Sequence, residues 1–204
     1  MKALQRLVWL GVVLLAAAPA WAQAPQGTPT RIRGTVDSLS GDTLMVNSRD
    51  GQMLHVMLAP NYTVRTMVVK KLADVKANDY VAITSMKGTD GRLHAVEVRI
   101  FPEALRGTAE GQFPWDLMPD SIMTNATVGS IAAAAKGQTL KVTYKGNSSE
   151  IDVGPEVPVM TYGPGDSSLL KKGAAVFIIA LKKEDGTLTS GNVTAEKDGI
   201  KPPM

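Results

Sequence analysis

The residues best suited to binding chemistry lie in one short segment, residues 101–125, with the sequence FPEALRGTAEGQFPWDLMPDSIMTN. Its single tryptophan stands among charged side chains, and the candidate contact residues are Arg106, Glu110, Trp115 and Asp116. An aromatic ring among charges is typical of a binding surface, because the ring supplies buried area and the charges supply orientation. The other interpretation is structural, since large aromatic side chains mostly serve burial. Both interpretations hold if the segment lies at a junction between folded units.

Two methionines of the same segment, Met118 and Met123, suggest an alternative function. Thioether sulfur is a soft ligand that suits cuprous copper, so the chain would be an accessory periplasmic metal-binding protein of copper type, or one associated with metal transport. Methionine is also a common filler of irregular core space. The two histidines, His55 and His94, have no partner at metal-ligand spacing. The sequence therefore predicts neither a cofactor nor a resident metal.

Motifs for catalysis are missing from the sequence. It contains no Gly-x-Ser-x-Gly nucleophile motif, no P-loop and no Gly-x-Gly-x-x-Gly fingerprint. Carboxylates such as Glu110 and Asp116 could act as an acid and a base on a glycoside, but the sequence shows no long aromatic-lined sugar cleft. We therefore expect a protein that binds and does not transform its ligand.

Two similar stretches of sequence flank the segment and must position it. Residues 34–100 contain GTVDSLSGDTLMV and DGRLHAVEV, and residues 126–195 contain ATVGSIAAAAKGQTLKV and DGTLTSGNV. Alternating apolar residues separated by Asp-Gly or Gly-Asp steps predict short antiparallel strands. A repeat of this length makes each copy a structural unit.

The expected fold class is all-β, with two tandem small OB-like β-barrels joined by a non-repeated connector. Barrel closure removes the exposed edges that small sheets of five or more strands would otherwise present. A single merged sandwich is the alternative. The expected boundaries are a first barrel repeat at residues 31–100, the connector at 101–125, a second barrel repeat at 126–198 and a tail at 199–204.

The turn and core positions of the two copies share a pattern that can be compared with known families. In the first copy it falls on Gly34, Val36, Leu44, Val46, Leu72, Val75, Val81, Asp90, Gly91, Leu93, Ala95 and Val98. This pattern resembles the DUF5666-like exported bacterial domains of unknown function, here in two tandem copies. The resemblance implies an OB-like barrel and export, and it implies no catalytic residue. Ala126 departs from the pattern, because it stands where the first copy has Gly34.

Residues 1–22 have the three parts of a cleavable secretory signal. Lys2 and Arg6 form a basic start, residues 7–18 are apolar, and Ala20-Trp21-Ala22 offers a small-x-small cleavage site. The apolar stretch is shorter than the roughly 20 residues that span a bilayer, which leaves an uncleaved anchor as the alternative. A flexible lead is expected at residues 23–30. We therefore expect a periplasmic protein without a transmembrane segment after removal of the signal.

Charge narrows the range of partners. The signal contains two of the 22 Lys and Arg and none of the 19 acids, so the exported chain is close to neutral. A near-neutral protein lacks the basic track that nucleic-acid binding needs. The sequence predicts an exported, non-enzymatic binding or interaction module with its contact surface at the connector. Its expected partner is a protein or an envelope component, and the sequence does not fix its oligomeric state.

Overall fold

The computed structural model describes residues 27–204, and within this range the chain is all-β, as predicted. The predicted signal and residues 23–26 of the predicted lead lie outside the described residues. The strands are β1 (Thr28–Ser40), β2 (Thr43–Ser48), β3 (Met53–Lys70), β4 (Tyr80–Lys87), β5 (Leu93–Ile100), β6 (Gly111–Pro114), β7 (Ile122–Ala133), β8 (Gln138–Tyr144), β9 (Asn147–Val153), β10 (Val159–Pro164), β11 (Ala175–Lys182) and β12 (Leu188–Ala195). Three short 3-10 helices, at Leu72–Asp74, Glu103–Leu105 and Ser167–Leu169, interrupt the connections. No helix among residues 27–204 is long and apolar enough to cross a membrane.

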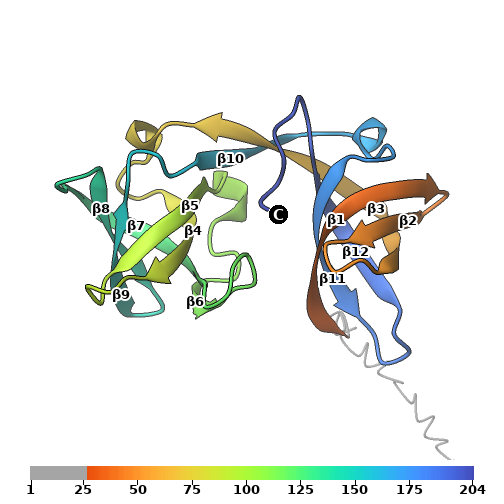
Figure 1. The fold of residues 1–204 in the computed structure, drawn as a ribbon, viewed down its shortest axis with the longest axis horizontal. Helices are drawn as coiled ribbons and strands as arrows, with labels where there is room; N and C mark the ends of the chain where they lie inside the picture. The colour runs from red at the N-terminus through yellow and green to blue at the C-terminus, as the bar shows by residue number, and fades with distance from the viewer. Residues whose placement is uncertain (1–26) are drawn as a thin grey trace, which may run out of the picture.

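Five strands form a closed barrel, which we call the first barrel. Strand β1 pairs with β2 and β11, β2 pairs with β3, and β12 closes the ring by pairing with β11 and in parallel with β3 (Figure 1). The barrel interior contains the alternate apolar side chains of all five strands, among them Ile32, Val36, Leu44, Val56, Ile178 and Val193. Strand β1 begins at Thr28, inside the predicted lead, because it pairs with β11 from its first residue.

The strands β4, β5, β7, β8 and β9 form a second strand group with its own apolar core. Strand β4 pairs with β5 and β7, β8 lies between β7 and β9, and two parallel residue pairs join β5 to β9. The core of this group contains Val81, Ile83, Val98, Leu140 and Ile151, each fully buried. The short strand β6 lies outside the ring and pairs with β7.

Each group takes strands from both sequence repeats, which differs from the predicted arrangement of one barrel per repeat. Strands β1–β3 come from the first repeat and pair with β11 and β12 of the second, whereas β4 and β5 of the first repeat pair with strands of the second. The reason lies in β3, which runs for 18 residues and leaves the first barrel to pair with β10. Strand β10 also pairs with β5, so one continuous sheet runs through both groups (Figure 1).

The packing around Gly34 explains why the two copies differ at this position. A Cβ atom on Gly34 would lie 2.2 Å from the carbonyl oxygen of Asn47, because β2 continues alongside to Ser48. In the second copy, β8 ends at Tyr144 and its pairing with β7 begins at Thr127, one residue after Ala126. Ala126 therefore keeps its methyl group, which is fully buried in the core of the second group.

We expect Gly34→Ala to destabilise the protein by about 1–3 kcal/mol, because the new methyl group meets backbone atoms that cannot rotate away. The matched control is Gly191→Ala on β12, where a Cβ atom would meet nothing within 4 Å. The control should change the free energy of unfolding by less than about 0.5 kcal/mol. Urea unfolding of both variants provides the measurement, and equal stabilities would show that β1 and β2 separate at little cost.

Candidate functional site

Both faces of β4 are covered, and this places a set of side chains between the two strand groups. Its first six residues, Tyr80–Ser85, are all buried, whereas a strand with one wet face would alternate. Val81 and Ile83 point into the core of the second group. Ala82 and Thr84 point the other way, because successive side chains on a strand lie on opposite faces. The junction between the groups is therefore packed against this outer face.

The register of the sheet places three polar or small residues side by side on this face. Ala82 lies opposite Arg99 on β5 and opposite Asn125 on β7. In the next row of the same face, Thr84 lies opposite Glu97 and Met123. These residues are at most 6% exposed, although three of them carry charge or an amide. Together they form one wall of the junction.

The first barrel supplies the opposite wall from its own outward-facing residues. Arg33 on β1 pairs in register with Phe177 on β11, and Arg31 pairs with Ile179. Phe177 in turn lies opposite Thr194 on β12, which pairs with Arg65 on β3. These side chains alternate with core residues such as Ile32 and Ile178, so they point out of the barrel.

The connector fills part of the space between the walls and leaves a cavity of about 440 Å³. Its lining residues come from both strand groups, the connector and β10, and they are Pro29, Arg31, Arg65, Ala82, Arg99, Phe101, Leu105, Thr108, Ala109, Phe113, Trp115, Met123, Asn125, Tyr162, Phe177, Ile179, Asn192 and Thr194. Five of the eight aromatic residues in positions 27–204 belong to this set. The cavity therefore combines aromatic walls with arginine side chains.

Trp115 lies at the centre of the aromatic contacts. Its ring makes edge contacts with Phe113, at a centroid distance of 6.1 Å, and with Phe177, at 6.2 Å. The guanidinium of Arg31 lies 4.2 Å from the ring centroid, and that of Arg33 lies 5.5 Å from it. The ring therefore packs between the two groups and also lines the cavity, while its role in binding stays a prediction.

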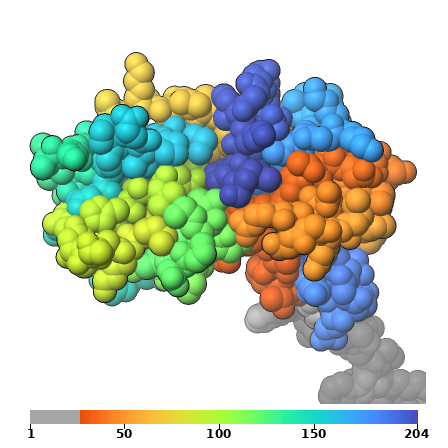
Figure 2. Space-filling model, viewed as in Figure 1, coloured from red at the N-terminus to blue at the C-terminus, as the bar shows by residue number. Residues whose placement is uncertain are grey.

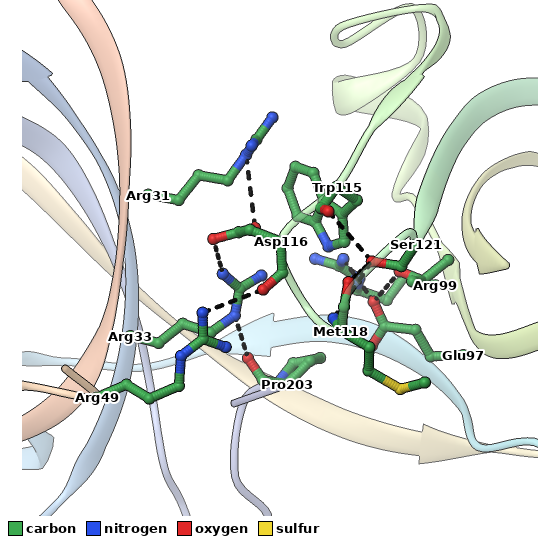
Figure 3. A network of polar contacts seen from close by, with 11 residues as sticks. Arg31, Arg33, Arg49, Glu97, Arg99, Trp115, Asp116, Met118, Ser121 and Pro203 are labelled. Atoms are coloured by element: carbon green, nitrogen blue, oxygen red, sulfur yellow. Dashed lines mark hydrogen bonds and ion pairs between the residues drawn. The ribbon is translucent and has the colours of Figure 1, made fainter. Parts of the chain in front are cut away.

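Asp116 anchors the connector to the first barrel through a cluster of arginines (Figure 3). Its Oδ2 accepts a hydrogen bond of 2.6 Å from Nη1 of Arg33, and its Oδ1 lies 3.8 Å from Nε of Arg31. Arg49 donates to the backbone carbonyl of Asp116, and Nε of Arg33 donates to the carbonyl of Pro203. Burial lowers the pKa of Arg33, and the Asp116 carboxylate opposes that shift. The ion pair therefore compensates a guanidinium that is almost fully buried.

The Pro203 contact brings the C-terminal segment into the junction. Figure 2 shows this segment, in dark blue, lying on the surface between the second strand group and the first barrel. Pro202 is buried there, although only Pro203 and Met204 follow it in the sequence.

A second polar cluster lies on the wall formed by β4 and β5. Oε1 of Glu97 accepts hydrogen bonds from Nη2 of Arg99, at 2.8 Å, and from the hydroxyl of Thr84, at 2.7 Å. Nη1 of Arg99 lies 3.3 Å from the hydroxyl of Tyr162 and donates to it. Burial works against the charge of Arg99, but Glu97 and Tyr162 outweigh it, so the pKa of Arg99 is raised. The guanidinium stays charged beside the cavity.

Several polar atoms beside the cavity have no hydrogen-bond partner within residues 27–204. They are Nε of Arg99, Nε1 of Trp115 and Oδ1 of Asn125, all buried and all on residues that line the cavity. A buried donor or acceptor without a partner costs about 1–3 kcal/mol, so native proteins rarely keep several in one place. Two donors and one acceptor are thus available to a bound molecule.

Of the four predicted contact residues, Trp115 lines the cavity, whereas Arg106, Glu110 and Asp116 do not. Arg106 forms a bidentate pair with Glu103 and donates to the carbonyl of Asn78, while Oε1 of Glu110 accepts from the backbone N–H of Lys145. Burial raises the pKa of Tyr80 to about 12, and Glu110 adds to the shift. Arg106 and Glu110 therefore attach the connector to the second group, whereas Trp115 and Asp116 face the first barrel.

The two methionines proposed as copper ligands have different surroundings. Met123 is 2% exposed and pairs with Phe113 across β6 and β7, whereas Met118 is 39% exposed in the loop before β7. Among residues 27–204, no group of three or more His, Asp or Glu side chains could hold a metal ion. His55 is exposed, and Nε2 of His94 contacts Asp90 at 3.0 Å on the surface.

No family model, no curated protein and no solved structure matches the chain. The function is therefore inferred from the site itself.

Reasoning from the sequence missed the arginines of the cavity, Arg31, Arg65 and Arg99, together with Asn125 and Tyr162. A usable signal was present for one of them. Residues 96–100 read VEVRI. In a strand, Glu97 and Arg99 share one face, and the apolar residues Val96, Val98 and Ile100 share the other. Paired opposite charges at alternate strand positions indicate a second buried face when the preceding strand begins with an apolar run, here Tyr80–Ile83.

Proposed function

We propose that the chain is an exported, non-enzymatic binding module whose ligand site is the cavity between two OB-like barrels. The observation that carries this proposal is that the cavity is assembled from every part of the fold. Both strand groups, β10 and the connector each contribute lining residues. A site placed where separately packed units meet is the usual position for ligand pockets in proteins.

The pairings support treating the second strand group as a second barrel. Each of the five pairings of the first barrel has a counterpart among β4, β5, β7, β8 and β9, including a parallel contact, β5 with β9, that corresponds to β12 with β3. Small closed barrels of five strands with irregular rims are the OB-type architecture.

The chemistry of the lining supports binding over turnover. The cavity presents arginine guanidinium groups, aromatic rings, threonine hydroxyls and asparagine amides. Such groups hold and orient a molecule, whereas proton transfer and nucleophilic attack use carboxylates, imidazoles or activated hydroxyls. The proposal therefore has three parts: the protein is exported to the periplasm, it binds a small-molecule or envelope-derived ligand, and it does not catalyse a reaction.

Native mass spectrometry of the full chain, purified gently from its own cells, tests the proposal. We expect the wild-type protein to have an added mass and the Ala82→Leu variant to lack it. Ala82 lines the cavity, so the larger leucine side chain occupies space that the ligand would fill. Ala133→Leu, on an exposed residue at the end of β7, is the matched control and should keep the added mass. An added mass that survives in Ala82→Leu would place the ligand elsewhere and contradict the proposal.

A further inference from the structure

The electrostatic character of the cavity points to the charge of its ligand. Three arginines line it and none of its lining residues is acidic. Arg99 is paired with the buried carboxylate of Glu97. Arg31 lies 3.8 Å from Asp116, but the carboxylate of Asp116 lies closer to Arg33. Arg65 forms no ion pair within residues 27–204. Arg65 therefore keeps its positive charge without an acidic partner, and a second positive charge is only partly compensated, because Arg31 and Arg33 share the one carboxylate of Asp116.

Tyr162 connects this free charge to the second wall. The guanidinium of Arg65 lies 5.6 Å from the centre of the Tyr162 ring, and the hydroxyl of the same residue accepts from Arg99. Arg65 and Arg99 thus flank one tyrosine on β10, and Nε of Arg99 has no partner. An arginine with free N–H groups is well suited to a carboxylate, because its planar donors match the two oxygens.

The rest of the lining favours a flat apolar body. Phe101, Phe113, Trp115 and Phe177 line the cavity beside Leu105 and Ile179. Aromatic side chains pack against flat rings in offset or edge-to-face arrangements, and they offer little to a strongly hydrated ion such as free phosphate. A volume of about 440 Å³ lies within the range of small-molecule pockets.

We propose that the cavity binds a small organic monocarboxylate with an aromatic or similarly flat apolar body, its carboxylate held by Arg65 with support from Arg99. This inference rests on the proposed function, because it names the ligand class of the same site. Among the lining residues, the other unpartnered buried atoms are Nε1 of Trp115, which would donate to the ligand's body, and Oδ1 of Asn125, which would accept from it. A carboxylate on a flat apolar body fits this lining better than a phosphate ester, because the aromatic and aliphatic side chains offer little to a strongly hydrated phosphate group.

Isothermal titration calorimetry of the full chain with three matched probes tests this assignment. The probes are 3-phenylpropionate, the neutral 3-phenylpropionamide and the cationic 3-phenylpropylamine, which share one ring and one chain length. We expect the carboxylate to bind at least about ten-fold more tightly than the amide, since a hydrogen bond to a charged group contributes about 1.5–3 kcal/mol. The amine should bind more weakly than the amide.

Arg65→Gln identifies the charge responsible. We expect it to weaken carboxylate binding about ten-fold and to bring the affinity for the carboxylate close to that for the amide. Lys70→Gln, which removes an exposed cation from the same strand, is the matched control and should bind all three probes like the wild type. Circular dichroism of Arg65→Gln checks the fold, and measurable binding of the amide checks that the cavity is still open.

The outcomes separate this inference from the proposed function. Equal affinities for the carboxylate and the amide, both lost in Ala82→Leu, would overturn the carboxylate assignment and leave the cavity as a binding site. Equal carboxylate affinities of the wild type and Arg65→Gln would also overturn it. If no probe binds and the native protein has no added mass, both the ligand class and the cavity as a site are wrong.

Discussion

Replacing Asp116 with alanine should lower the free energy of unfolding by about 3–5 kcal/mol, the usual cost of leaving a buried charge without its partner. The side chain of Arg33 is 2% exposed, and its ion pair with Asp116 is 2.6 Å long. Without this carboxylate, the guanidinium keeps only the carbonyl of Pro203 and the faces of Phe177 and Trp115. Urea unfolding followed by circular dichroism gives the measurement.

Two further variants separate the ion pair from general effects of losing a carboxylate. Glu184→Ala removes an exposed acid from the turn between β11 and β12 and should change stability by less than about 0.5 kcal/mol. Combining Asp116→Ala with Arg33→Met should recover much of the loss, because an apolar side chain needs no compensation in that place. If Asp116→Ala unfolds at the same urea concentration as the wild type, the arginine cluster does not anchor the connector.

Residues 27–104 alone should fail to fold, although they contain a complete sequence repeat. Strands β1–β3 would lack β11 and β12, and β4 would lack β7, so both groups would be opened. Open small sheets with exposed edges are not stable on their own. We expect a spectrum of an unfolded chain by circular dichroism, and recovery of the native spectrum after mixing with residues 105–204.

A cut in the folded protein is the control for that experiment. A protease site inserted at Gly107, where a side chain would meet nothing within 4 Å, should allow cleavage of the connector without loss of the fold. The two halves should then remain associated through the strands that they exchange. A native-like circular dichroism spectrum from residues 27–104 alone would show instead that one repeat can close on itself.

The strands and turns could be predicted from the sequence because they depend on local patterns. Alternation of apolar residues and the Asp-Gly steps mark β2, β5 and their counterparts in the second repeat. The exchange of strands between repeats could not be predicted in this way. The sequence of β3 has the same apolar pattern in both cases, whether the following chain turns back into the same barrel or continues into the second strand group. Only long-range pairing, such as that of Gly34 with Val176, decides between them.

The candidate site was predicted in part. The connector was expected to lie at a junction, and Trp115 and Asp116 are indeed there, whereas Arg106 and Glu110 serve to attach the connector. The arginines of the cavity come from strands, where a single sequence does not show whether a charged residue faces water or a second packed unit. The resemblance to DUF5666-like domains, export and the partner stay predictions, because none of the comparisons tests them.

The pairing of β1 with β11 also sets the order in which the chain can finish folding. A chain is made from its N-terminus, so β1–β3 exist long before their partners in the first barrel, β11 and β12, are synthesised. The core of the second strand group is complete once Val159, the first residue of β10, has been made, so this group can close earlier. In the meantime β1 and β3 present unpaired edges, which invite association with other chains and slow the final closure. The part of the protein that is made first is therefore the part that is completed last.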